Sequence, residues 1–304
     1  MSSFSGVYPI LYSFFGADGR LDHEAMQLQV DRCIAAGVHG IAVLGNVTES
    51  NKLTQAERVE LMELVGESIA GRVPYAVTIG EPSIDGQKAL ARVAEAACAD
   101  WLILQPPAVK GVPESEIVRF FGAVADAASL PIAVQNNPVN MDVWLSNPSL
   151  LALHRNHPNV SLLKGEGAAS WVQQLIEATG GSLDVFAGLA GIEQIANLES
   201  GCVGLIPAPD CVDIQVRIHA LWQEATEDSR AEAERLYKEV LPLIVFMTRN
   251  LQTHQLAVGK RFVAKRLGLA EVHVRTPAAT PTPFQLREVA RIGDWLGPLG
   301  GERR

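Results

Sequence analysis

Residues 37–65 read GVHGIAVLGNVTESNKLTQAERVELMELV and carry the pattern of a strand, a loop and a helix in that order. Residues 40–44 form a short, continuously apolar run, which is typical of a parallel strand covered on both faces. Thr54 and Glu57 have the spacing of a capping box, which marks the first turn of a helix. The apolar residues that follow recur at helical spacing: Val59, Leu61, Met62 and Val65. The stretch therefore predicts one βα unit.

Similar apolar runs occur along most of the chain and begin every 19 to 35 residues, which is the length of one βα unit in a barrel. We expect eight strands, at 6–10, 40–44, 75–79, 101–105, 132–135, 161–164, 184–187 and 203–206. A doubly wound open sheet is the alternative, but no glycine-rich nucleotide-binding motif follows any of these runs. The sequence therefore predicts an α/β fold, specifically a (β/α)8 TIM barrel.

Helical signals flank the predicted strands. Asp22 can cap a helix that runs to about Ala36, and Pro113 suits the first turn of another. Beyond the last strand, helical periodicity continues at 218–225, 229–250, 254–267 and 283–296, and no Ser/Gly-rich linker intervenes. We expect a barrel over residues 1–208, with a C-terminal helical segment over 209–304 packed on it as part of a single structural unit.

Composition limits the classes of partner. The 304 residues are 48% hydrophobic and have a net charge of −9, which favours a globular protein and argues against nucleic-acid binding. No apolar stretch approaches 18 residues and the N-terminus lacks the basic start of a signal peptide, so we expect a cytoplasmic protein that does not bind membranes. The four cysteines match no zinc or redox spacing and are expected to be buried thiols.

Lys164 is the first candidate for chemistry. The active site of a TIM barrel lies at the carboxyl ends of its strands, and Lys164 closes the apolar run at 161–164. Burial there disfavours the ammonium form, and a neutral amine can attack a carbonyl to form a Schiff base. An ordinary solvated lysine at the end of a strand is the other interpretation.

The loop at residues 45–50 is the second candidate. Gly45 permits a tight turn, after which the amides of Asn46 and Val47 can form a nest for the carboxylate of a 2-keto acid. A plain connecting loop is the alternative. Gly188 and Ile206, at the ends of the last two strands, are further candidates for contacts with the substrate. Because no metal-ligand motif or serine-nucleophile motif occurs, we expect a site without metal or cofactor in which the lysine does the chemistry.

Three stretches carry a family resemblance. Residues 37–54 resemble the strand and G-T-T-G-E-S-x-x-L-T signature of the dihydrodipicolinate synthase / N-acetylneuraminate lyase family, and residues 13–22 resemble its start. Lys164-Gly165-Glu166 stands where that family has its Schiff-base lysine. The resemblance covers nearly the whole chain. It implies that Lys164 is the nucleophile, that no cofactor is needed, and that the protein is a homotetramer built as a dimer of dimers.

Several family positions differ in this chain. The paired threonines fall at Asn46 and Val47, the strand-five tyrosine falls at Gln135, and the tyrosine lent by a neighbouring subunit falls at Pro107 or Ala108. The synthase's substrate-binding arginine is absent from residues 137–141. These differences argue against a true dihydrodipicolinate synthase. Residues 134–138 (VQNNP) and the basic stretch at 259–261 are instead similar to family members that dehydrate 2-keto-3-deoxy sugar acids.

The resemblance implies a Schiff-base lyase that acts on pyruvate or a small 2-keto acid, and a dehydratase of a 2-keto-3-deoxy sugar acid in carbohydrate metabolism is the favoured member. In that mechanism Lys164 attacks the C2 carbonyl, Gln135 orients the substrate, and either bound water or Glu49 carries the proton, unless Glu49 only braces its loop. A pyruvate-dependent aldolase or synthase, including one with dihydrodipicolinate synthase-like activity, is the second hypothesis. A catalytically silent binding protein on the same scaffold is the third.

Overall fold

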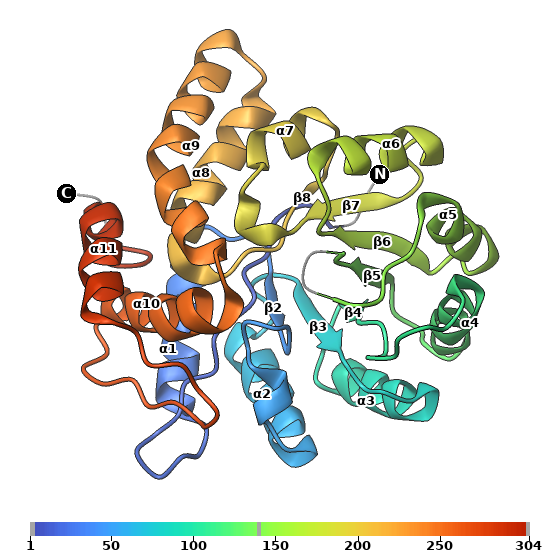
Figure 1. Ribbon diagram of the computed structural model, residues 1–304, viewed down its shortest axis with the longest axis horizontal. Coiled ribbons are helices and arrows are strands. Elements are labelled where there is room, and N and C mark those ends of the chain that lie inside the picture. The colour runs from blue at the N-terminus through green and yellow to red at the C-terminus, as the bar shows by residue number, and fades with distance from the viewer. Residues whose placement is uncertain (1–3, 139–140, 302–304) are drawn as a thin grey trace.

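The computed structural model describes residues 4–138 and 141–301, and its centre is a sheet of eight parallel strands (Figure 1). The strands follow one another around the sheet in the order β1-β8-β7-β6-β5-β4-β3-β2. They are β1 (Gly6–Val7), β2 (Ile41–Val43), β3 (Tyr75–Ile79), β4 (Trp101–Leu104), β5 (Ile132–Asn136), β6 (Val160–Gly165), β7 (Asp184–Ala187) and β8 (Gly204–Leu205). A parallel bridge between Ile10 and Ala42 joins β1 to β2 and closes the ring. The predicted TIM barrel is confirmed.

All eight predicted strands are present, although their lengths differ. The strands predicted at 75–79 and 184–187 match β3 and β7 residue for residue. The first and last strands are shorter than predicted, because Pro9 and Pro207 lie beside them and have no amide hydrogen with which to continue a ladder.

Helices surround the barrel and alternate with its strands (Figure 1). The Asp22 carboxylate caps α1 by accepting a hydrogen bond from the amide of Ala25, and both halves of the predicted Thr54–Glu57 capping box are present on α2. The helices are α1 (His23–Ala35), α2 (Gln55–Ile69), α3 (Ile84–Ala96), α4 (Glu114–Ala125), α5 (Asn147–Asn156), α6 (Ala169–Thr179), α7 (Gln194–Glu199) and α8 (Val212–Glu224).

The C-terminal segment packs against one side of the barrel (Figure 1). It contains α9 (Glu227–Thr248), the π-helix η4 (Leu251–Gly259), α10 (Lys260–Leu267) and α11 (Pro283–Gly293). The single helix predicted over 254–267 is therefore corrected: helical structure begins earlier, at Leu251, where the Asn250 side chain accepts hydrogen bonds from the next amides, and its first nine residues are π-helical. The domain division at 208/209 stays a prediction.

Large aromatic side chains fill part of the interior of the barrel. The rings of Trp101 and Phe186 stack with centroids 5.4 Å apart, and the Tyr8 ring meets the Phe186 ring edge-on at 5.3 Å. Small residues on neighbouring strands, Ala42 and Ala76, make room for them. The interior is therefore a packed core, and the active site of such a barrel lies at the carboxyl ends of its strands.

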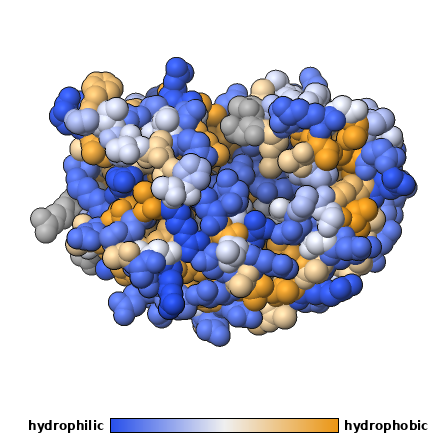
Figure 2. Space-filling model, turned by 60° about the horizontal axis from the view of Figure 1, so that its bottom comes forward, coloured by the Kyte–Doolittle hydropathy of each residue, from blue (hydrophilic) through white to orange (hydrophobic). Residues whose placement is uncertain are grey.

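The surface is predominantly hydrophilic on the face shown in Figure 2, where apolar residues occur in small separate groups. Cys33, Cys202 and Cys211 are buried as predicted, and burial raises the pKa of Cys33 and of Cys202 to about 12. The prediction is wrong for Cys98, which is exposed in a turn after α3 where its backbone is left-handed. Within the described residues, no helix combines the length and apolar character needed to cross a bilayer.

Candidate active site

Lys164 and Glu166 lie together at the carboxyl end of β6. Lys164 is only 4% exposed, and its Nζ is 3.5 Å from Oε1 of Glu166. Residues two apart on an extended chain point to the same side, which explains why both side chains face one cleft. The cleft is lined by Ile10, Asn46, Val47, Asn137, Lys164, Glu166, Leu189, Ala190, Ile206, Pro207, Ala208, Met247, Thr248, Leu251 and Gln255. Lys164 is thus a buried amine that reaches a cavity large enough for a small acid.

Two amides hold the Glu166 carboxylate in place. The Nδ2 of Asn137 donates to Glu166 Oε2 at 2.8 Å, and the Nε2 of Gln135 donates to the same oxygen. The other oxygen, Oε1, is the one nearest to Lys164. No chemical role was predicted for Glu166, although its position two residues beyond Lys164 was a signal that could have indicated one.

Gly188 makes room for this carboxylate. A Cβ added at Gly188 would lie 2.0 Å from Cγ of Glu166, so any larger residue on β7's loop would displace the glutamate. Gly188 was predicted to contact the substrate, and the structure places it against Glu166. Ile206, the other residue predicted at a strand end, lines the cleft.

A chain of side-chain amides links residues that follow β2, β4 and β5 to the carboxylate that follows β6. Gln105 Nε2 donates to Gln135 Oε1 at 2.9 Å and lies 3.3 Å from Asn46 Oδ1. Gln135 is 1% exposed and its amide is engaged on both sides, by Gln105 and by Glu166. Gln135 was predicted to orient the substrate; in the structure it orients Glu166. Gln105, which the sequence analysis placed only at a strand end, completes the chain.

The loop at residues 45–50 presents Asn46 and Val47 to the cleft. The amides of Thr48 and Glu49 turn back and donate to the carbonyl oxygens of Gly45 and Asn46, each at 3.1 Å. The structure shows no hydrogen bond from the backbone amides of Asn46 and Val47 to any other described residue. Gly45 lets this loop pack on Ile10, because a Cβ there would lie 2.7 Å from Ile10 Cδ1. That these two amides bind the carboxylate of the substrate stays a prediction.

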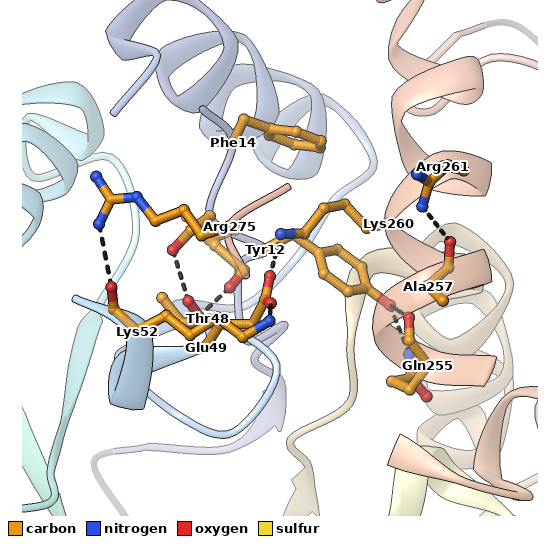
Figure 3. Close-up of polar contacts among 12 residues, drawn as sticks. Tyr12, Phe14, Thr48, Glu49, Lys52, Gln255, Ala257, Lys260, Arg261 and Arg275 are labelled. Atoms are coloured by element: carbon orange, nitrogen blue, oxygen red, sulfur yellow. Dashed lines mark hydrogen bonds and ion pairs between the residues drawn. The ribbon is translucent and has the colours of Figure 1, made fainter. Parts of the chain in front are cut away.

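Buried contacts on other residues hold the loop at residues 45–50 in place (Figure 3). Glu49 accepts a hydrogen bond from Lys52 Nζ at 2.5 Å and also pairs with Lys260 of α10. Ser13 Oγ donates to the carbonyl of Thr48 at 2.6 Å. Burial lowers the pKa of Lys260, and the adjacent Glu49 carboxylate opposes that shift. Glu49 does not line the cleft, so of its two expected roles the structure favours bracing over proton transfer.

The C-terminal segment forms one wall of the cleft. Met247 and Thr248 come from the end of α9, and Leu251 and Gln255 come from η4. The sequence analysis predicted helices here but no part in the site, because these residues carry no motif that marks them. Val139 and Asn140, in the stretch that lacks the synthase arginine, fall outside the described residues.

Comparisons with known proteins identify the family of this chain. Residues 3–292 match the model of the Dihydrodipicolinate synthetase family, so the chain belongs to that family. The family and the relative described next indicate that the protein is an enzyme of the lyase type. It is 32% identical over 302 residues to an L-2-keto-3-deoxyarabonate dehydratase from Azospirillum brasilense, covering 97% of this chain and 95% of the relative. It is 28% identical over 280 residues to a 4-hydroxy-tetrahydrodipicolinate synthase from Rhizobium meliloti, covering 90% and 92%.

Solved structures share the fold. The 4-hydroxy-tetrahydrodipicolinate synthase from Methylacidiphilum fumariolicum SolV superposes with a TM-score of 0.88 at 24% identity, and the match covers 95% of each chain. A prophage protein of the dihydrodipicolinic acid synthase family from E. coli K12, solved in complex with pyruvate, superposes with a TM-score of 0.87 at 22% identity, covering 97% of this chain and 99% of that one.

Proposed function

We propose that this protein is a Schiff-base-forming lyase that dehydrates a 2-keto-3-deoxy sugar acid. The observation that carries the proposal is the pairing of Lys164 with Glu166 in one cleft, 3.5 Å apart, with the glutamate held by two amides. The similarity to a 2-keto-3-deoxyarabonate dehydratase supports the substrate class.

Lys164 forms the covalent link to the substrate. Its ammonium group first releases a proton to water in the cleft, and the free amine attacks the C2 carbonyl. The hydroxyl of the adduct then takes up that proton and leaves as water, which gives an iminium ion. The amides of Asn46 and Val47 hold the C1 carboxylate, which places C2 near the lysine. The positive charge on the iminium nitrogen then acidifies the hydrogens on C3.

Glu166 moves the proton. Its carboxylate takes a proton from C3, and the released electron pair forms the C2–C3 double bond of an enamine. The enamine expels the C4 hydroxyl, which takes the proton back from Glu166 and leaves as water. Attack of a second water on the conjugated iminium frees the product and regenerates Lys164. Glu166 thus serves as the proton carrier in place of the missing tyrosine hydroxyl.

An aldolase or synthase is the second candidate. The similarity to several 4-hydroxy-tetrahydrodipicolinate synthases at about 28% identity supports it, since the same enamine can add to an aldehyde. Product analysis separates the two. We expect a panel of 2-keto-3-deoxy acids to yield dehydrated products of the same carbon number; cleavage to pyruvate and an aldehyde would assign the aldolase instead.

The family also motivates proposals on assembly and location. We infer a homotetramer, arranged as a dimer of dimers, that acts on its small-molecule substrate in the cytoplasm. Sedimentation equilibrium tests the assembly, and a mass near that of one 32.7 kDa chain would contradict it.

A further inference from the structure

The wall of the cleft contributed by the C-terminal segment contains one buried polar side chain with a fixed orientation. Gln255 lies in the π-helix η4 and lines the same cleft as Lys164. Only 5% of its surface is exposed. π-helical turns are frequent at functional sites because they place side chains where an α-helix would not.

A buried network fixes the side-chain amide of Gln255 (Figure 3). Its Nε2 donates to Tyr12 Oη at 2.6 Å and to Asp210 Oδ2 at 2.5 Å. Tyr12 Oη in turn donates to Asp210 Oδ1 at 2.8 Å. An amide nitrogen carries two hydrogens, and both have acceptors here.

The chemistry of these partners determines which end of the amide faces them. Burial raises the pKa of Asp210 to about 6, so at neutral pH the group is a carboxylate that can only accept hydrogen bonds. Gln255 must therefore turn its nitrogen toward Asp210. The hydrogen-bonding group that remains for a molecule in the cleft is the acceptor Oε1.

We propose that Gln255 is a specificity-determining residue whose Oε1 accepts a hydrogen bond from a hydroxyl on the distal carbon of the substrate, beyond C4. This inference rests on the proposed Schiff-base function and assigns to Gln255 the recognition of the hydroxylated tail of its substrate. A buried acceptor of this kind favours a substrate that brings a donor over an analogue that leaves the acceptor unpaired.

The charged residues of the cleft favour a substrate whose distal end is uncharged. Of the described residues that line it, Lys164 and Glu166 are the charged ones. Lys164 is used in the Schiff base, so a second carboxylate on the substrate would meet only the negative charge of Glu166. The neighbours of Gln255 in the wall, Met247, Thr248 and Leu251, are uncharged as well.

The test compares 2-keto-3-deoxyarabonate with its 5-deoxy analogue, 4-hydroxy-2-oxopentanoate, as substrates for the full-length enzyme. Gln255→Met keeps the length of the side chain and removes the acceptor. We expect kcat/KM for 2-keto-3-deoxyarabonate to fall by ~10-fold, the scale of one hydrogen bond, while kcat/KM for the 5-deoxy analogue changes by less than about twofold. The control is Gln252→Met, which alters an exposed residue of the same π-helix and is expected to change neither value.

An equal loss on both substrates, or no loss on either, would overturn the proposal. Asp210→Asn provides a second variant if Gln255→Met does not fold. It keeps the side-chain volume but no longer dictates which way the Gln255 amide turns, so it too should reduce the preference for 2-keto-3-deoxyarabonate; an unchanged preference in Asp210→Asn also contradicts the proposal. Trapping of the wild-type protein with pyruvate is measured in parallel, because its failure would reject the Schiff-base function itself and not only the role of Gln255.

Discussion

The buried ammonium group of Lys260 pairs with the Glu49 carboxylate and thereby ties α10 to the loop at residues 45–50, which is more than 200 residues away in the sequence. Lys52 contacts the other oxygen of Glu49, so two cations share one carboxylate in a buried cluster. Both cations contact the loop that we propose to bind the substrate carboxylate. The C-terminal segment therefore supports the binding site both through this ion pair and through the wall of the cleft.

Replacement of Lys260 by methionine tests this support. Breaking a buried ion pair costs about 3–5 kcal/mol, and we expect the lower end of that range in the free energy of unfolding because Lys52 still pairs with Glu49. KM should rise more than kcat falls, since the loosened loop binds the substrate carboxylate less well. Urea denaturation and steady-state kinetics measure both. The control is Lys265→Met on the exposed face of α10; if its effects equal those of Lys260→Met, the buried pair has no special role.

Replacement of Glu166 by glutamine tests proton transfer. The amide keeps the size of the side chain but cannot act as a base, so we expect kcat to fall by ~100- to 10,000-fold. Formation of the Schiff base with pyruvate should persist, because Lys164 performs that step. Turnover within threefold of the wild type would show that another group carries the proton.

Gln135→Ala should lower kcat/KM by ~10- to 100-fold, the scale of one or two positioning hydrogen bonds of about 1.5 kcal/mol each. The reason is that Gln135 donates to Glu166 and accepts from Gln105, so its loss releases the carboxylate. We expect the loss mainly in kcat, with trapping by pyruvate largely intact. Unchanged turnover would show that the amide chain does not matter for the reaction.

The buried His219 predicts a dependence of stability on pH. Burial, reinforced by the nearby His39, lowers the pKa of His219 from 6.5 to about 4, so the unfolded chain takes up a proton before the folded one does. The contribution of His219 to the free energy of unfolding is therefore fully present above pH 6.5. It is lost as the pH falls toward 4, by about 3 kcal/mol in total. Asp210, whose pKa is raised to about 6, has the opposite sign over part of this range.

Comparison with a variant isolates the histidine. His219→Gln removes the titrating group and leaves Asp210 in place, so the free energy of unfolding of the wild type should fall more steeply than that of the variant between pH 6.5 and 4. Chemical denaturation at a series of pH values gives both curves. Parallel curves would mean that His219 does not titrate differently in the folded and unfolded chains.

Local patterns were sufficient to predict the barrel. Continuous apolar runs located every strand, and Asp22 and the Thr54–Glu57 pair marked the starts of their helices, because each signal depends on residues a few positions apart. Lys164 was predicted for the same reason, since a lysine that closes an apolar strand is visible in the sequence.

The parts that were missed depend on contacts between distant segments. The role proposed for Glu166 rests on its contacts with Gln135 and Asn137, at the end of the neighbouring strand. The role proposed for Gln255 rests on its contacts with Tyr12 and Asp210. The π-helix was also missed, because its apolar spacing is too short to separate from that of an α-helix. Such contacts form only after the barrel closes, so no local pattern records them.

The most direct test of the Schiff-base mechanism is reductive trapping. The protein is incubated with pyruvate and sodium borohydride, digested, and analysed by mass spectrometry, with Lys164→Ala as the matched control. We predict a reduced pyruvate adduct on Lys164 in the wild type and none at any residue in the variant. No adduct at Lys164, or equal labelling of Lys164→Ala, would contradict the Schiff-base mechanism.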